Sequence, residues 1–222
     1  NLLAGGEELV AGAEALDGPS LTAARGWARE LGIHLLAGSI AERGEAELVS
    51  NASVLIGPDG EDLAGYRKIH MFDVDVGGVS YRESEHERPG SELVTAPLGE
   101  LIAGLSVCYD LRFPVFSRIL ALRGARLFTR STAFTASTAS DHRDVLPRAR
   151  AIENSLFVLA PNQVGAAPPH FDSFGHSAIV DPWGKVLALA PAGPVRAVGV
   201  LEAPIAAAVG RRLFKERLSL RQ

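Results

Sequence analysis

The sequence is poor in cysteine, since Cys108 is the only one among 222 residues. A single cysteine cannot form a disulfide within the chain, so a secreted fold held together by disulfides is excluded and a reducing compartment suits the protein. We therefore expect a cytoplasmic location. The cysteine stands in "GLSVCYDLRFP" (residues 104–114), where an apolar run gives way to a polar turn.

Long apolar runs and an excess of basic residues are also missing. No apolar stretch reaches the roughly 18 residues that a membrane-spanning helix needs, and the formal net charge is −4. Nucleic-acid-binding domains are usually basic, so we expect neither a membrane nor a nucleic acid as partner. The histidines follow no metal-ligand spacing, and glycine-rich nucleotide motifs are absent. We therefore expect no metal and no cofactor.

The remaining composition predicts one globular domain over residues 1–222. With 47% hydrophobic and 22% charged residues the chain can bury a substantial core. Strand-length apolar segments alternate with fewer amphipathic helices, which indicates a layered α/β fold with a mixed sheet. Pro, Asp and Gly at 56–62 and 180–186 predict hairpins. Strands are expected at 33–39, 51–57, 62–67, 100–108, 125–130, 155–162, 176–181, 185–190 and 197–202, and helices at 19–31, 114–123, 141–154 and about 204–217.

Cys108 is placed for chemistry rather than for packing. The expected strand 100–108 delivers it to a turn, and a helix begins within a few residues, near 112–114. A helix N-terminus presents free N–H groups, which favour a thiolate over a thiol. The alternative is a cysteine that fills space in the core.

Two residues around a long expected loop, 70–92, are candidates to act with this cysteine. Lys68 ends a strand, and the apolar residues after it would draw it inward, where an ammonium stabilises a thiolate and then an oxyanion. Glu83 lies within the loop, and loops of this length usually serve a site. The plainer alternatives are a solvated lysine at a strand end and a solvated acidic face.

Arg112 follows the cysteine by four residues and is a candidate ligand for a substrate carboxylate, which a guanidinium can bind through two nitrogens. Its alternative is an ion pair with Asp110 that stiffens the turn. His70 and Asp73 are more simply interpreted as hydrogen-bond partners that organise the loop.

Several motifs in order resemble the nitrilase, or carbon–nitrogen hydrolase, superfamily, most closely its Nit-type, omega-amidase-like branch. They span about residues 15–205 and read YRKIHMFD, YRESE with PG, GLSVCYDLRFP, RARAIEN, APNQVG and GHSAIVDPWGKVLA. The resemblance implies an α-β-β-α sandwich that pairs through its sheets into dimers. It also implies a Glu–Lys–Cys triad that cleaves a small linear amide through a thioester and releases ammonia.

The resemblance carries roles to individual residues. Cys108 matches the nucleophile and Lys68 the triad lysine. Tyr109 matches the residue whose backbone N–H helps the lysine to hold the oxyanion. Glu83 matches a second glutamate beside the lysine, and Arg112 falls where carboxylate-binding members place an arginine.

The sequence departs from the family pattern at its start and near the cysteine. The first strand, the first helix and the general-base glutamate are expected before Asn1, so the printed chain is either a fragment or a form without its base. Val115, Arg130, Ser131 and Arg143 stand where the pattern has other residue types. An arginine on a buried strand is costly unless it is paired, and the sequence offers no account of Arg130.

Three alternatives stay open beside an amidase. An N-carbamoyl-amine or nitrile hydrolase would share the triad and differ in the pocket. A catalytically silent binding or scaffold dimer would suit a chain without its base. A cysteine redox sensor would suit the lone thiol but would leave Lys68 and the ordered motifs unexplained.

Overall fold

The structure is a computed structural model that describes residues 6–44, 48–76, 78–132, 142, 144–167 and 171–191. Its helices are α1 (Glu7–Ala11), α2 (Pro19–Leu31), α3 (Pro114–Leu122) and α5 (Val145–Asn154), with 3-10 turns η1 (Glu83–Glu85) and η2 (Cys108–Arg112). Its strands are β1 (Leu35–Arg43), β2 (Val49–Ile56), β3 (Asp62–Arg67), β4 (Asp73–Val76), β5 (Val79–Arg82), β6 (Thr95–Leu98), β7 (Leu101–Val107), β8 (Leu127–Ser131), β9 (Phe157–Ala160), β10 (Val164–Ala167), β11 (Phe171–Phe174), β12 (Ala178–Val180) and β13 (Val186–Leu189).

In the described part of the chain, most strands belong to two sheets. The first sheet is three-stranded and antiparallel, in the order β1-β2-β3, and the second is six-stranded, in the order β13-β12-β9-β8-β7-β6. The central strands β7, β8 and β9 run parallel, and the outer pairs are antiparallel. The second sheet is therefore mixed, as the sequence predicts.

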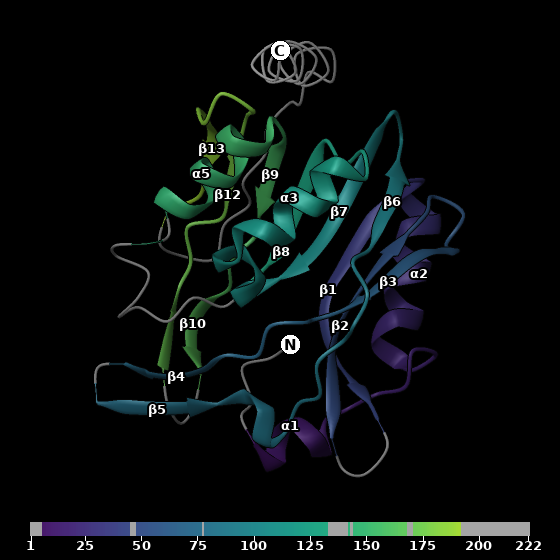
Figure 1. The fold of residues 1–222 in the computed structure, drawn as a ribbon. Coiled ribbons are helices and arrows are strands. Elements are labelled where there is room, and N and C mark those ends of the chain that lie inside the picture. The colour runs from purple at the N-terminus through teal and green to yellow at the C-terminus, as the bar shows by residue number, and fades with distance from the viewer. Residues whose placement is uncertain are drawn as a thin grey trace.

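The two sheets pack face to face between layers of helices. Every residue of β2 is buried, because both faces of the first sheet are covered. Val54 and Ile56 face α2, whereas Leu55 belongs to the core cluster shared with the second sheet. Figure 1 shows α2 outside the first sheet, with α3 and α5 on the far side of the second sheet. The layers are α-β-β-α, so the expected sandwich is confirmed.

Helix α2 has the bounds that the sequence predicts, and only part of its apolar surface is buried. Pro19 opens it, and Gly32 closes it in the left-handed conformation with φ 62°. Leu21 and its neighbours one and two turns along are buried against the first sheet. Trp27 and Leu31 follow the same apolar spacing, yet they are 57% and 64% exposed.

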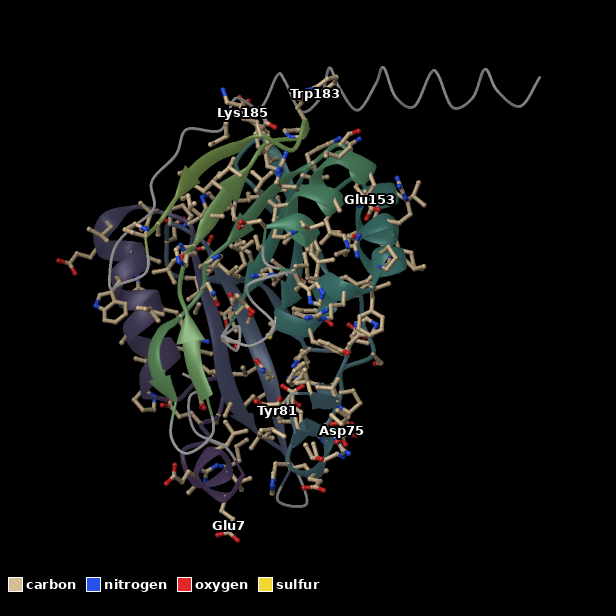
Figure 2. All side chains as sticks on the ribbon, turned by 90° about the vertical axis from the view of Figure 1, so that its left-hand side faces the viewer. Glu7, Asp75, Tyr81, Glu153, Trp183 and Lys185 are labelled. Carbon is tan, nitrogen blue, oxygen red and sulfur yellow. The ribbon has the colours of Figure 1, made fainter. Side chains whose placement is uncertain are left out.

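The long loop expected at 70–92 contains its own secondary structure. Strands β4 and β5 form a two-stranded hairpin that is followed by η1. Figure 2 shows Asp75 and Tyr81 of this hairpin far from the β12–β13 turn that carries Trp183 and Lys185. The strand expected at 197–202 and the helix at about 204–217 lie outside the described residues. No described helix has the length and apolar character needed to cross a membrane.

Candidate active site

Cys108 lies at the carboxyl end of β7, where parallel strands of α/β proteins usually place their ligands. Val107 still has extended dihedral angles, but Cys108 has a positive φ of 47°. A residue with a Cβ pays about 1–3 kcal/mol for such a conformation and is held in it by its surroundings. The chain therefore turns sharply at the half-buried cysteine, into η2 and then α3.

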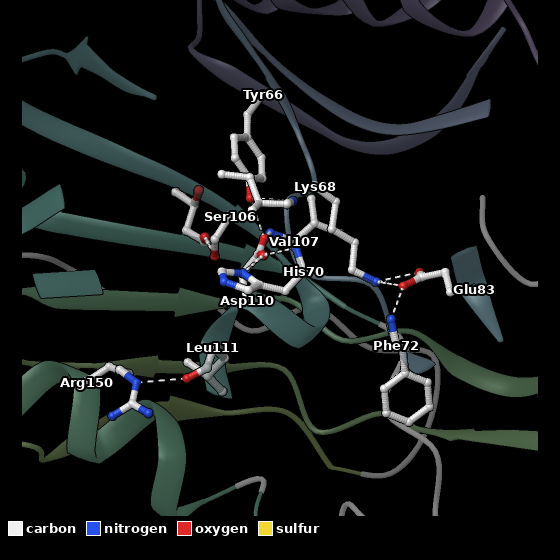
Figure 3. Close-up of polar contacts among 12 residues, drawn as sticks. Tyr66, Lys68, His70, Phe72, Glu83, Ser106, Val107, Asp110, Leu111 and Arg150 are labelled. Carbon is white, nitrogen blue, oxygen red and sulfur yellow. Dashed lines mark hydrogen bonds and ion pairs between the residues drawn. The ribbon is translucent and has the colours of Figure 1, made fainter. Parts of the chain in front are cut away.

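Asp110 fixes this turn from inside the protein. Its Oδ2 accepts hydrogen bonds from the Val107 N–H at 2.9 Å and from the Tyr66 hydroxyl at 2.6 Å. Its Oδ1 accepts from the His70 backbone N–H at 3.2 Å and contacts His70 Nδ1 at 2.7 Å (Figure 3). Burial and the Asp110 charge raise the pKa of Tyr66 far above its usual range, so its hydroxyl stays a donor. Asp110 therefore anchors the Cys108 turn, although the sequence suggested it only as an alternative ion-pair partner of Arg112.

Lys68 is buried at the end of β3. Its residue is 1% exposed, and its ammonium forms an ion pair with both carboxylate oxygens of Glu83 (Figure 3). Burial lowers the pKa of Lys68, but the charges of Glu83, Cys108 and Glu87 outweigh it, so the pKa lies above its usual value. Lys68 is therefore a permanent cation near the thiol, and the solvated alternative is wrong.

Glu83 is held between the loop and this lysine. Besides Lys68, its Oε2 accepts a hydrogen bond from the Phe72 N–H at 2.5 Å. The Phe72 ring contacts Tyr81 and Tyr109, with centroid distances of 5.2 and 5.0 Å. The structure thus brings Glu83 and Lys68 together and docks the loop beside the cysteine. The alternative of a solvated acidic face is wrong for Glu83.

Glu87 is a carboxylic acid in this cluster that the sequence did not single out. It is 6% exposed, although it stands in a run of charges that is typical of a solvated surface. Its burial depends on a bridge to Val49 in β2, far away in sequence, so no local signal could have found it. Among the described His, Cys, Asp and Glu residues, no group of three or more could hold a metal ion.

Arg112 is half-buried and points to a histidine rather than to Asp110. Both terminal guanidinium nitrogens lie 3.2 Å from His142 Nδ1, and the guanidinium lies 5.7 Å from the centre of the Tyr109 ring. The Asp110 carboxylate is occupied by other donors, so the predicted alternative of an Arg112–Asp110 ion pair is wrong. Arg112 is the last residue of η2, the 3-10 turn that begins at Cys108.

Arg130 adds a second buried cation that the sequence flagged but could not explain. It is 1% exposed and lies on β8 opposite Ser106. Burial lowers the pKa of Arg130 to about 10, against the raising effect of the Cys108 charge, and the Arg112 charge lowers it further. It therefore remains cationic at neutral pH. Arg130 lines a cavity of about 140 Å³ between the second sheet and α5.

Comparison with known proteins matches this arrangement to one family. The family model for carbon–nitrogen hydrolases matches residues 3–210. The chain is 41% identical to a deaminated glutathione amidase from Yersinia enterocolitica over 181 residues, which cover 79% of this chain and 63% of the relative. It is 38% identical to omega-amidase NIT2 from Homo sapiens over 179 residues, which cover 80% of this chain and 64% of the relative.

A solved structure supports the same grouping. The NitFhit protein of C. elegans superimposes with a TM-score of 0.87 at 34% sequence identity, covering 96% of this chain and 52% of that chain. This chain thus spans less than two thirds of the length of the relatives named above.

Proposed function

The chain belongs to the carbon–nitrogen hydrolase family, and from this premise we propose that it is a thiol hydrolase that cleaves the C–N bond of a small linear amide. The observation that carries the proposal is the buried Lys68 ammonium, which is paired with Glu83 and acts electrostatically on the Cys108 thiol. Burying an ammonium costs several kcal/mol unless it is paired. Such a cost suits a group that must stabilise negative charge at one place.

In the proposed reaction, Cys108 Sγ attacks the amide carbon and the carbonyl oxygen becomes an oxyanion. Lys68 and the backbone N–H of Tyr109 stabilise this oxyanion. The C–N bond then breaks, the nitrogen takes up a proton and leaves as ammonia, and the acyl group stays on sulfur as a thioester. Water hydrolyses the thioester to a carboxylic acid and returns the thiol. The resemblance assigns the general-base steps to a glutamate that precedes the matched motifs.

We propose that the preferred amide also carries a carboxylate. Arg112 is half-buried near the turn that holds Cys108, and its guanidinium presents a planar donor face next to the Tyr109 ring. Arg130 on the neighbouring strand β8 adds a second positive charge that interacts with the charge of Cys108. Two relatives carry amidase names, which favours an amide over the N-carbamoyl-amine and nitrile alternatives.

Ammonia release from a panel of amides, N-carbamoyl-amines and nitriles tests the proposal on the full-length protein. We expect hydrolysis of short amides, fastest for those with a carboxylate. Cys108→Ala and Cys108→Ser are expected to lower kcat by about a thousandfold or more. Cys108 is the only cysteine of the 222 residues, and alkylation with iodoacetamide that peptide mapping assigns to Cys108 must inactivate the enzyme in step with labelling.

Lys68→Met is expected to lower kcat by about a hundredfold or more, because the oxyanion loses its cationic partner. Lys185→Met is the matched control, since Lys185 is an exposed lysine in the β12–β13 turn. Full activity of Lys68→Met, or hydrolysis that survives complete alkylation of Cys108, would contradict the proposal. Failure to release ammonia from any member of the panel would favour a silent binding protein.

We further propose that two copies of the chain pair and that the protein works where its thiol stays reduced, as in the cytoplasm. The mechanism needs a free thiol at Cys108, which an oxidising compartment would not preserve. Exposed apolar side chains on the outer helices support pairing through this helical layer, and not directly through the sheets as the resemblance implies. They include Val115 and Leu122 on α3 and Val145 and Ile152 on α5.

A further inference from the structure

The backbone around Glu87 is hydrogen-bonded to Val49, the first residue of β2. The Glu87 N–H donates to the Glu83 carbonyl at 2.9 Å, and the neighbouring residues 86 and 88 exchange hydrogen bonds with Val49 at 3.0 and 2.9 Å. These bonds turn the side chain inward, so that Glu87 is 6% exposed in a segment whose neighbour Glu85 is exposed. The position of the buried carboxyl is therefore built into the fold.

The Glu87 carboxyl lies close to another carboxyl inside the protein. Glu83 of η1 and Asn51 of β2 both act on it, and its Oε2 has no hydrogen-bond partner among the described residues. Two neighbouring carboxyls, one of them buried without a hydrogen-bond partner for its Oε2, do not both ionise readily, so one of them holds a proton. Glu83 already accepts hydrogen bonds from Lys68 and from the Phe72 N–H, so Glu83 is the anion and Glu87 the neutral acid.

The charges around Glu87 agree with this assignment. Burial and the charge of Glu83 raise the pKa of Glu87 to about 8, although Lys68 opposes the rise. The groups that face it are Glu83 from η1, Lys68 from the end of β3 and the neutral Asn51 from β2. A neutral Glu87 leaves Lys68 and Glu83 as a balanced pair.

We propose that Glu87 is a positioning residue of the proposed hydrolase, which donates a proton-bearing hydrogen bond to Glu83 and so keeps the Lys68 ammonium available to Cys108. This inference rests on the proposed function for its effect on catalysis. Ionisation of Glu87 adds a second carboxylate beside one ammonium. The ammonium is then shared between two anions, and the cluster opposes the thiolate and the oxyanion.

The first test is the pH dependence of ammonia release. Because the neutral acid is the working form, we expect kcat/KM of the wild type to fall about tenfold per pH unit above pH 8. Glu87→Gln keeps a donor of the same shape and cannot ionise, so this alkaline limb should disappear or move by more than about one pH unit. Glu85→Gln, the exposed neighbour, should keep the limb. An unchanged limb in Glu87→Gln would overturn the proposal.

The second test needs no turnover, so it separates failure of this inference from failure of the proposed function. In the unfolded chain Glu87 loses its proton near the ordinary glutamate pKa of 4.5, whereas the fold raises this pKa to about 8. Wild-type stability should therefore fall relative to Glu87→Gln as pH rises between these values. The difference in urea midpoint should grow over this range and then stay constant. A difference that is independent of pH would show that Glu87 is ionised in the fold.

A measurement on the wild type covers the case in which Glu87→Gln does not fold. Infrared difference spectra between neutral and alkaline pH should show loss of one protonated carboxyl band centred near pH 8. Glu85→Gln should show the same loss. Absence of a protonated carboxyl at neutral pH would refute the assignment of Glu87 as the acid.

Discussion

Asp110 is fully buried, and each of its two carboxylate oxygens accepts hydrogen bonds. One oxygen receives the backbone N–H of Val107 and the other that of His70. Through Val107 it fixes the residue before the nucleophile, and through His70 it fixes the start of the loop that follows Lys68. At the scale of single residues, this carboxylate therefore links the cysteine to the lysine.

Asp110→Asn should be strongly unfavourable even though the two side chains have the same shape. Each carboxylate oxygen faces a backbone N–H donor, so the amide NH₂ meets a donor in either orientation. Leaving a buried donor unsatisfied costs about 1–3 kcal/mol. We expect a loss of this size in the free energy of unfolding in urea, together with slower alkylation of Cys108 at neutral pH.

Asp59→Asn is the matched control for this change. Asp59 is exposed in the turn between β2 and β3, where Asn before Gly is equally suitable. We expect an effect within about 0.5 kcal/mol. If Asp110→Asn unfolded at the same urea concentration as this control, Asp110 would not be the anchor of the turn.

At the scale of elements, the approach of α3 to β7 depends on a missing side chain. A Cβ added at Gly104 would lie 3.1 Å from Leu120 Cδ1 and 3.2 Å from Leu120 Cβ. The glycine in this strand therefore lets the helix that follows Cys108 pack directly on the sheet. Because η2 connects β7 to α3, the distance between this strand and this helix constrains the position of the Cys108 turn.

Gly104→Ala should destabilise the protein by about 1 kcal/mol, and Gly104→Val by up to about 3 kcal/mol, because Leu120 must move away from the strand. Gly65→Ala in β3 is the control, since a Cβ there meets nothing within 4 Å. That change should be neutral or stabilising by up to about 1 kcal/mol. Thermal unfolding of the three variants measures their relative stability. Equal effects of substitution at Gly104 and Gly65 would contradict the role proposed for Gly104.

At the scale of the whole molecule, the helical layer over the second sheet has an apolar outer surface. Leu122 of α3 is 65% exposed and Ile152 of α5 is 50% exposed. Ile152 also lies against Gly184 in the β12–β13 turn, next to Trp183, which is 79% exposed. The exposed apolar surface therefore continues from α5 to this turn, and burial against a second copy would remove it from water.

Leu122→Glu combined with Ile152→Glu should convert the proposed dimer to a monomer, because an unpaired charge in an apolar interface costs several kcal/mol. Light scattering after size exclusion measures the mass. Leu31→Glu on α2 is the control, since Leu31 is 64% exposed on the opposite outer layer. Dissociation by the Leu31 variant alone would place the interface on α2, and a wild type of single-chain mass would refute pairing.

Most strands of the two sheets and the helices α2, α3 and α5 were readable from local patterns, whereas α1, β4, β5, β6, β10 and β11 were not predicted. The bounds of α2 agree with its apolar spacing, its early proline and its closing glycine, and the strand that ends beside Cys108 was expected within a residue. The burial and partners of polar residues were harder to predict from the sequence. The acids at 83 and 87 look alike in the sequence, yet one holds Lys68 and the other faces the first.

The sequence by itself determined the layered α/β class with its mixed sheet, the place of the cysteine at a strand end and the candidates Lys68 and Glu83, because hydrophobic periodicity is a property of neighbouring residues. The family resemblance of its motifs added the α-β-β-α sandwich. Only the tertiary structure decided that Lys68 is buried and charged, that Asp110 holds the turn and that Arg112 turns to His142. Burial and charge pairing depend on which distant segments meet. A carboxyl group that would be solvated in an isolated segment becomes a hydrogen-bond acceptor that holds a turn, or a neutral acid, when a distant segment buries it.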